Sequence, residues 1–362
     1  MSAVYINIAY TRGSFSLKMN VEIPEGIIGV FGASGHGKSS LLKLLAGIED
    51  PDWGRIVIHG KTMFDKDLKI KVPARRRRMG LVFQEGRLFP HMSVRKNLMY
   101  GYQSSSSIHF NEVVSLLELG TLLSKKPREC SGGEKQRIAI GRMLLGSPEV
   151  LMLDEPFSAL DQRLRRNIIP YLIKIHERYR LPILVVSHDI SDLLMLTNQL
   201  LIVEDGTIAG FGHYHDLLFD PQCQPLLMNG EEANAVRLRA QSIDRIGDLT
   251  AFYYYSEYSS NCLLLDTIYT IVPDDQIILS IPPANVSLSK ERIALISSRN
   301  QLQGTVTDIK FSGKKVFCSV DVGFPLLVEI TRPALEKLDL KVGDPLFCLF
   351  KTVSMKILSI GK

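Results

Sequence analysis

The sequence has little of what secreted, zinc-binding or membrane-spanning chains carry. Its five cysteines are odd in number and far apart, and no two of them form a C-x-x-C pair. A disulfide framework or a zinc site is therefore not expected, and a reducing compartment fits best. No apolar run approaches the roughly 18 residues of a membrane span, and the first residues lack a secretory hydrophobic segment. We expect any membrane role to come through a partner.

The excess of positive over negative charge is also small. The 43 lysines and arginines outnumber the 38 acidic residues only slightly, which leaves a net charge of +5 over 362 residues. This small excess does not predict a protein that coats nucleic acid, although a local anion site stays open. Lys69, Lys71 and Arg75–Arg78 form one basic run without interleaved aromatic residues. We expect a solvated face near a membrane partner, with contact to nucleic acid or anionic lipid as the alternative.

The first part of the chain alternates short apolar runs with helical patterns. The runs are rich in Val, Ile and Leu, as strands buried on both faces are. They are Ile27–Phe31, Leu81–Phe83, Val150–Leu153, Ile183–Val186 and Leu200–Val203. Between the first two, Leu41–Leu45 has helical spacing and precedes Gly47, a helix stop. This alternation predicts an α/β fold with a mostly parallel, helix-covered sheet, and an α+β arrangement is the alternative.

The pattern changes after about Asn229. A linker-like stretch leads into strand-like runs such as Cys262–Val272, with glycines between later runs. Near the C-terminus, Ser319 and Asp321 alternate with apolar residues, which predicts a strand with one buried and one solvated face. The apolar residues are Val316, Cys318, Val320 and Val322. The sequence therefore predicts a second, all-β domain resembling a barrel.

A phosphate-binding loop is predicted between the first buried strand and the helix after it. Gly32-Ala33-Ser34-Gly35-His36-Gly37-Lys38-Ser39 matches G-x-x-x-x-G-K-[ST], and Ser40 follows it. The glycines let the backbone curl so that N–H groups point toward an anion, and the helix N-terminus adds positive charge. Lys38 is placed to reach the β- and γ-phosphates, and the Ser39 hydroxyl to ligate Mg²⁺. His36 occupies a variable position, and we expect no chemistry from it.

Two carboxylates follow the buried run Val150–Leu153. The strand delivers Asp154 and Glu155 to its C-terminal edge, where ligands bind in open α/β sheets. Asp154 suits a direct or water-mediated contact to Mg²⁺, which prefers oxygen ligands. Glu155 is then placed to orient or deprotonate an attacking water.

The segment Cys130-Ser131-Gly132-Gly133-Glu134-Lys135-Gln136-Arg137 resembles the L-S-G-G-Q signature of ATP-binding cassette (ABC) ATPases. Its small residues begin a helix and offer a second N–H-rich anion site. The resemblance implies a head-to-tail dimer, in which Ser131, Gly132 and Gly133 of one copy close over the γ-phosphate held by the other copy. Cys130 replaces the usual Leu and Glu134 the usual Gln. We expect Glu134 to slow closure around a polyanion without abolishing activity.

Further residues follow the same family pattern. Gln84 matches the Q-loop glutamine, which contacts the metal and the attacking water and senses the membrane partner. Ser158-Ala159-Leu160-Asp161 resembles the D-loop, so Asp161 is implied at the dimer interface. His188 matches the switch histidine that touches the γ-phosphate. Tyr10 is the expected adenine-stacking residue, and Phe15 competes for that role.

Segments within the cassette and in the β domain after it narrow the resemblance to importers. Gly86–His91 and Ile169–Leu172 look like the ATPase of molybdate importers, and Ser297–Leu302 and Lys351–Ser354 resemble small molybdate-binding (Mop-type) β domains. A tetrahedral oxyanion needs a cationic fork, hydroxyls and backbone N–H groups. The candidate ligands are Ser297, Ser298, Arg299, Lys351 and Ser354. A structural role for this stretch, dimerisation, or sensing of cytosolic oxyanion are the alternatives.

The resemblance implies an organisation and an activity. Residues 1–228 would form the ABC ATPase domain, with 87–147 as its helical and signature subdomain; 229–295 a linker and first β lobe; and 296–362 a Mop/TOBE-like, OB-like β domain. The expected activity is hydrolysis of ATP with Mg²⁺ to power molybdate import. The ATPase homodimer would sit at the cytoplasmic face of the cell (inner) membrane, held there by a permease dimer. A periplasmic or surface oxyanion-binding protein would act indirectly, and no nucleic acid is expected.

Two other functions stay open at this point. The chain could serve another importer, for sulfate, tungstate, iron or a sugar. It could also be a soluble ABC ATPase without a transport role, although such proteins usually carry two cassettes or a long coiled-coil insertion.

Overall fold

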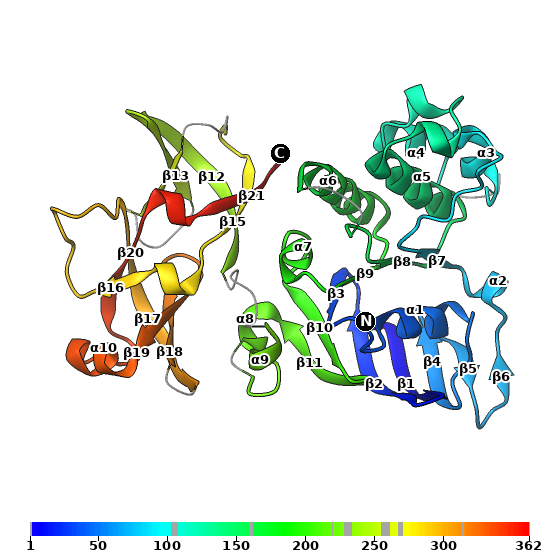
Figure 1. Cartoon of the computed structure of the whole chain (residues 1–362), viewed down its shortest axis with the longest axis horizontal. Coiled ribbons are helices and arrows are strands. Elements are labelled where there is room, and N and C mark those ends of the chain that lie inside the picture. The colour runs from blue at the N-terminus through cyan, green and yellow to red at the C-terminus, as the bar shows by residue number, and fades with distance from the viewer. Residues whose placement is uncertain are drawn as a thin grey trace. The chain divides into compact units, whose positions relative to one another are not determined.

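The structure, a computed structural model, describes residues 2–102, 108–158, 162–218, 220–227, 234–254, 261–266, 271–312 and 315–361. The chain forms two compact units, Met1–Leu226 and Leu227–Lys362 (Figure 1). In these described ranges, no helix combines the length and the apolar character that crossing a membrane requires.

Two sheets form the frame of the first unit (Figure 1). One is antiparallel, in the order β2-β1-β4-β5-β6. Its strands are β1 (Ser2–Arg12), β2 (Phe15–Pro24), β4 (Trp53–Ile58), β5 (Lys61–Asp65) and β6 (Ile70–Lys71). The other has the order β11-β10-β3-β9-β8-β7 and is parallel except for β11. Its strands are β3 (Ile27–Phe31), β7 (Met79–Val82), β8 (Val150–Asp154), β9 (Ile183–Ser187), β10 (Gln199–Glu204) and β11 (Thr207–His213).

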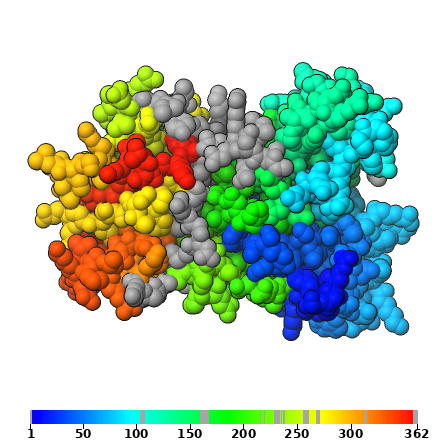
Figure 2. Space-filling model, viewed as in Figure 1, coloured from blue at the N-terminus to red at the C-terminus, as the bar shows by residue number. Residues whose placement is uncertain are grey.

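Helices connect these strands. They are α1 (Lys38–Ala46), α2 (Ala74–Arg77), α3 (Val94–Met99), α4 (Phe110–Leu116), α5 (Gly132–Leu145), α6 (Gln162–Tyr179), α7 (Ile190–Leu194), α8 (Tyr214–Leu217) and α9 (Gln224–Leu227). The helices α3 and α4 pack against α5, which also contacts α6 (Figure 1). The space-filling view shows α3 to α5, in cyan to blue-green, at the surface of this unit (Figure 2).

The predicted helix and its stop are confirmed. Leu41, Leu42, Leu44 and Leu45 are all fully buried on α1, and Gly47 ends the helix with φ 73°. Each such side chain contributes about 1.5–3 kcal/mol by leaving water. One hydrophobic core joins α1, the antiparallel sheet and the parallel strands. This packing fixes the N-terminus of α1 at the carboxyl end of β3.

The predicted parallel sheet is confirmed, whereas the antiparallel sheet was not expected. Along β2, the buried residues Leu17, Met19, Val21 and Ile23 alternate with exposed Lys18, Asn20 and Glu22. This period of two was present in the sequence and is typical of a strand with one solvated face.

The basic run is not uniformly solvated, and that prediction is wrong for Arg77. Its side chain has no exposed surface and donates to the carbonyls of Val72, Leu44 and Leu45 at 2.8, 2.8 and 3.1 Å. Burial lowers the pKa of this guanidinium. Because the last carbonyls of a helix lack intrahelical donors, Arg77 completes the hydrogen bonding at the C-terminus of α1.

The second unit consists of antiparallel strands, as the all-β prediction requires. One sheet has the order β14-β13-β12-β15-β21 and the other β16-β20-β17-β18-β19. The strands are β12 (Ala235–Ile246), β13 (Leu249–Tyr254), β14 (Cys262–Asp266), β15 (Gln276–Ser280), β16 (Ser287–Ser289), β17 (Asn300–Ser312), β18 (Lys315–Asp321), β19 (Pro325–Thr331), β20 (Pro345–Phe350) and β21 (Lys356–Gly361). One short helix, α10 (Arg332–Leu338), follows β19. A single hydrophobic core joins the two sheets.

The expected solvated face of β18 is wrong. Ser319 is 3% exposed, and its neighbour Phe317 is 1% exposed. The strand is flanked by β17 and β19 and contacted by α10, and only its two end residues, Lys315 and Asp321, are exposed. A polar residue in an alternating pattern was therefore not sufficient to identify a solvated face.

Candidate active site

The phosphate loop lies between β3 and α1, as predicted. Gly37 has φ 99°, a left-handed conformation that favours glycine. A Cβ atom on Gly32 would lie 2.2 Å from the carbonyl oxygen of Val203, so only glycine fits beside β10. Ala33, Ser34 and Gly35 are exposed. The loop therefore offers its backbone to an anion while its glycines permit the tight curl.

Lys38 places a cation inside this curl. The side chain is 5% exposed, and its ammonium donates to the carbonyls of Gly32 and Ala33 at 2.7 and 2.8 Å. Desolvation lowers the pKa of Lys38, while Glu155 and Asp154 raise it. A buried ammonium with carboxylates nearby suits a phosphate oxygen.

Ser39 and Asp154 meet across a long separation in sequence. The Ser39 hydroxyl donates to Asp154 Oδ1 at 2.9 Å, which joins the start of α1 to the end of β8. Burial raises the pKa of Asp154, and the Ser39 hydrogen bond opposes that shift. A hydroxyl and a carboxylate at one point are the hard oxygen donors that Mg²⁺ prefers, so these residues fit that ion.

Glu155 and His188 form the next pair. His188 Nδ1 lies 2.9 Å from both carboxylate oxygens of Glu155, which brings the ends of β8 and β9 together. The backbone of Glu155 has φ 48°, in the left-handed region that non-glycine residues rarely adopt. Such strain persists where the surrounding structure holds it, often at functional sites. The side chain of His188 is 54% exposed and that of Glu155 is 15% exposed, so the histidine lies on the solvent side of the pair.

Gln84 reaches the same carboxylate residue through Ser158. Its Nε2 donates to Ser158 Oγ at 3.0 Å, and this hydroxyl donates to the Glu155 carbonyl at 3.0 Å. The structure therefore links the segment after β7 with the segment after β8. Asp161 lies outside the described residues.

The signature residues form the beginning of α5. The Ser131 hydroxyl accepts from the Glu134 N–H at 3.3 Å, and the Glu134 carboxylate accepts from the Ser131 N–H at 2.6 Å. This is a capping box, in which each residue satisfies the other's backbone donor. Ser131 and Gly132 are exposed, whereas Gly133 is buried.

Comparison with known proteins places this geometry in a family. The ABC transporter model matches residues 17–158, and the TOBE domain model matches residues 296–357. Molybdenum import ATP-binding protein ModC of Rhizobium etli is 36% identical over 355 residues, covering 95% of this chain and 97% of that protein. The protein of the same name from Pasteurella multocida is 34% identical and covers 97% of this chain and 99% of its own length. The chain belongs to the ModC family of ABC ATPases.

Solved structures agree on the fold of the cassette. A bacterial Atm1-family ABC exporter with ATP bound has a TM-score of 0.53 at 24% identity, over 62% of this chain and 41% of that chain. The protein cbiO1 of Clostridium perfringens has a TM-score of 0.50 at 22% identity, over 63% of this chain and 99% of its own. At these identities the likeness concerns the fold alone. The predicted ABC cassette followed by a TOBE-type β domain is confirmed.

In this ModC-family chain, the two candidate adenine-stacking residues differ in placement. Tyr10 is 8% exposed within the core, and its hydroxyl donates to Glu49 at 2.6 Å, so its ring has little free face. Phe15 is partly exposed, and its Cζ would lie 2.7 Å from a Cβ atom on Gly37. The geometry therefore favours Phe15, the competitor, because its ring lies against the phosphate loop.

His36 has a structural contact that its variable position in the motif did not suggest. Its Nδ1 accepts from the Asp205 N–H at 3.1 Å, and its carbonyl accepts from the Gly206 N–H at 3.1 Å. These two hydrogen bonds connect the phosphate loop to the turn between β10 and β11. The sequence offered no local signal for this contact, because the partners lie far apart in the chain.

Sequence reasoning did not predict the hydrogen bonds of two buried residues that contact the segment after Gln84. Asn97 has no exposed surface and exchanges hydrogen bonds with the backbone of Phe89 at 2.8 and 3.1 Å. Arg142 of α5 is 8% exposed and donates to the carbonyls of Gly86 and Arg87 at 3.1 and 2.9 Å. The helix that begins at the signature is therefore bonded directly to the segment that follows Gln84.

The candidate oxyanion residues come together only in part. Asn300 of β17 pairs with Phe350 of β20, so Arg299 and Lys351 flank one end of this ladder. Both side chains are exposed, as is Ser297, while Ser298 and Ser354 are half-buried. The backbone brings the two segments side by side, and their role as anion ligands stays a prediction.

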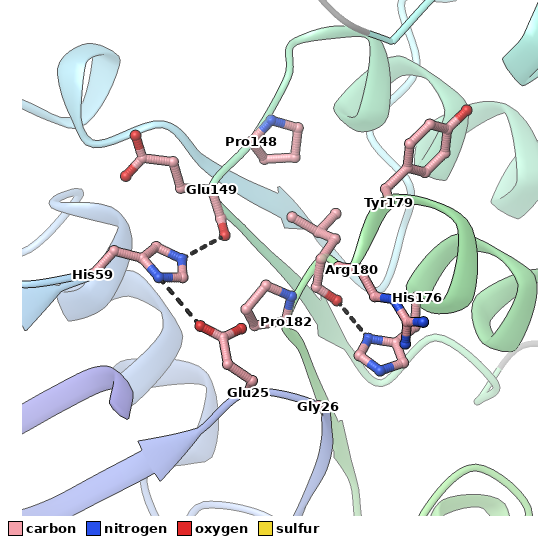
Figure 3. A pocket seen from close by; sticks show the side chains of 10 residues that line it. Glu25, Gly26, His59, Pro148, Glu149, His176, Tyr179, Arg180 and Pro182 are labelled. Carbon is pink, nitrogen blue, oxygen red and sulfur yellow. Dashed lines mark hydrogen bonds and ion pairs between the residues drawn. The ribbon is translucent and has the colours of Figure 1, made fainter. Parts of the chain in front are cut away.

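A cavity of about 610 Å³ lies at the opposite edge of the parallel sheet, beside the amino ends of β3 and β9 (Figure 3). Within it, His59 Nδ1 lies 3.4 Å from Glu25 Oε1, and His176 Nδ1 lies 2.9 Å from the carbonyl oxygen of Leu181. None of the predicted site residues lines it. The phosphate loop follows the carboxyl end of β3, so this cavity is separate from the candidate active site.

Proposed function

We propose that this chain is the ATP-hydrolysing subunit that powers molybdate import across the cytoplasmic membrane through a partner permease. The observation that carries the proposal is similarity to molybdenum import ATP-binding proteins over 95–97% of the chain, the β unit included. The assembled phosphate loop, carboxylates and signature supply the machinery that ATP hydrolysis needs.

Binding of ATP falls to the phosphate loop and its neighbours. The exposed backbone from Ala33 to Gly35 would receive phosphate oxygens, and Lys38 would turn its ammonium from loop carbonyls to the β- and γ-phosphates. Phe15 would stack on the adenine. Ser39 and Asp154 would hold Mg²⁺, with Gln84 as a further oxygen ligand. Held there, Mg²⁺ would supply positive charge against the negative charge that develops on the phosphate.

Hydrolysis depends on a positioned water. Glu155 would accept its proton or orient it, and His188, already bonded to that carboxylate, would hold Glu155 in place and face the γ-phosphate. Gln84, linked to the Glu155 carbonyl through Ser158, would report the state of the site to the segment that follows it. The protein contributes positioning and electrostatics more than covalent chemistry.

The second half of the site would come from another copy of the chain. Ser131, Gly132 and Gly133 of one copy would close over the γ-phosphate held by its partner, and Asp161 would cross the same interface. Closure would move the permease dimer through Gln84 and the segment after it. The homodimer would thus lie at the cytoplasmic face of the inner membrane, with an external oxyanion-binding protein acting upstream of the permease.

The β unit has a proposed role of its own. Ser297, Ser298, Arg299, Lys351 and Ser354 would bind oxyanion and lower ATPase activity when the cytosolic anion is plentiful. The proposed ATPase domain is 1–228, with 87–147 as its helical part; 229–295 and 296–362 together form the β unit.

Transport rescue tests the function. A strain deficient in molybdate uptake through loss of its own ATPase subunit would receive this chain together with a candidate partner permease. We expect molybdenum accumulation with the wild-type chain and none with Lys38→Ala. Stimulation of the reconstituted complex by sulfate, tungstate, iron or sugar instead would assign another importer. Failure to copurify with any permease would favour a non-transport ATPase.

A further inference from the structure

The Glu134 carboxylate occupies a backbone donor of the signature. It lies 2.6 Å from the Ser131 N–H, while the Ser131 hydroxyl accepts from the Glu134 N–H at 3.3 Å. The first N–H groups of a helix have no intrahelical acceptor and attract anions. In α5, one of these groups already bonds a full negative charge from the same chain.

This carboxylate keeps its charge near neutral pH. The Ser131 N–H lowers the pKa of Glu134, and the more distant cations Lys125 and Arg137 act in the same direction, while partial burial opposes them. In the part of the chain that the structure describes, Glu134 forms no ion pair, and the Arg137 guanidinium donates instead to the Leu117 carbonyl at 2.8 Å. The negative charge at the signature is therefore not neutralised by a contacting cation.

We propose that Glu134 is an internal anion that competes with the γ-phosphate for the signature and so raises the ATP concentration needed to close the dimer. The inference rests on the proposed function, in which Ser131–Gly133 of one copy meets the nucleotide of the other. Closure would place a phosphate against the helix N-terminus that Glu134 already serves. The incoming polyanion must displace this carboxylate or bind beside it.

Glu134→Gln isolates the charge. A glutamine amide oxygen can still accept from the Ser131 N–H, so the cap is retained while the charge is removed. The variant is made in full-length Glu155→Gln, in which hydrolysis is blocked, and dimer formation is followed by sedimentation as ATP is titrated. We expect half-maximal dimerisation at roughly five-fold lower ATP than in the Glu155→Gln parent, the size of one charge–charge contact at a hydrated surface. The ratio should stay constant from pH 6 to 8, because Glu134 remains ionised across that range.

The chain offers a matched control. The Glu129 carboxylate lies 2.6 Å from the Lys126 N–H in a second capping box, outside the three signature residues. Glu129→Gln should leave the ATP requirement unchanged. Glu134→Ala removes charge and cap together, and it should also lower the ATP requirement if charge is the cause, even if it lowers thermal stability.

Three outcomes contradict the inference. An ATP requirement for Glu134→Gln equal to or above that of the parent overturns it, as does an equal decrease in Glu129→Gln. If the Glu155→Gln parent still dimerises with ATP in either case, the proposed function stands and only this inference fails. If the Glu155→Gln parent itself stays monomeric at saturating ATP, the proposed function and this inference fail together.

Discussion

At the scale of single residues, Glu155 combines a strained backbone with a bonded carboxylate. Its φ of 48° aims the side chain at His188, 2.9 Å away, immediately after Asp154 has met Ser39. Two adjacent acidic residues thus serve different partners, one on α1 and one after β9. The sequence placed both at a strand end, but the conformation that separates their directions was not readable from it.

Glu155→Gln should therefore separate binding from turnover. The amide keeps the shape of the side chain but cannot accept the proton of the attacking water, so kcat should fall roughly 10²–10⁴-fold while ATP affinity stays within two- to three-fold. Steady-state ATPase assays and equilibrium nucleotide binding measure the two effects. Turnover at the wild-type rate would exclude Glu155 as the base.

Substitutions of Phe15 and Tyr10 should have different effects on ATP binding. Stacking of a base on an aromatic ring is worth roughly 1–3 kcal/mol, so Phe15→Ala should weaken ATP binding about ten-fold. Tyr10→Phe keeps the buried ring and removes only the hydroxyl that bonds Glu49, so it should lower stability by about 1 kcal/mol without changing ATP affinity. Fluorescent-nucleotide titration and denaturant unfolding measure these. ATP binding in Phe15→Ala equal to that of the wild-type chain would exclude Phe15 as the stacking residue.

At the scale of elements, apolar runs identified the strands that carry the site. A strand buried on both faces is a continuous apolar run, so it can be recognised from the local sequence alone. Leu81 and Val82 of the run Leu81–Phe83 fall on β7, Val150–Leu153 falls on β8, and the glycine after Leu41–Leu45 ends α1. Contacts between distant elements were not readable in this way. Arg77 looked like one of four equivalent arginines until the fold placed it over the C-terminus of α1.

Arg77→Ala should destabilise the first unit. The change leaves the carbonyls of Leu44 and Leu45 without this donor and empties a fully buried volume, so the free energy of unfolding should fall by roughly 2–4 kcal/mol. Arg76 is exposed on the same helix and provides the control, since Arg76→Ala should change stability by less than about 0.5 kcal/mol. Urea unfolding of both variants, followed by circular dichroism, compares them. Equal losses would mean that the run acts only as a charged surface.

At the scale of the whole molecule, each sheet of the β unit combines strands from before and after residue 296. The C-terminal strand β21 pairs with β15 and completes the sheet of β12 to β15, while β16, from before residue 296, pairs with β20. Buried polar groups cross the same divide: the Tyr254 hydroxyl donates to the Val322 carbonyl at 2.9 Å, and Asn234 donates to the Leu327 carbonyl at 2.7 Å. Sequence similarity alone marks 296–357 as a domain, but 12 of the 26 buried residues of its core, in the part of the unit that the structure describes, lie earlier in the chain.

This interleaving predicts how fragments behave. Residues 227–362 contain both sheets and should unfold in one cooperative urea transition, because the two sheets share one core. Residues 296–362 would lose β15, the pairing partner of β21, and the core residues Leu263 and Ile277. They would also leave Asn300 without its bonds to the backbone of Leu264. We expect that shorter fragment to show no cooperative transition and to bind a hydrophobic dye. A cooperative transition in it, at the midpoint of the longer fragment, would mean that the last strands fold independently and that anion binding can be assigned to them alone.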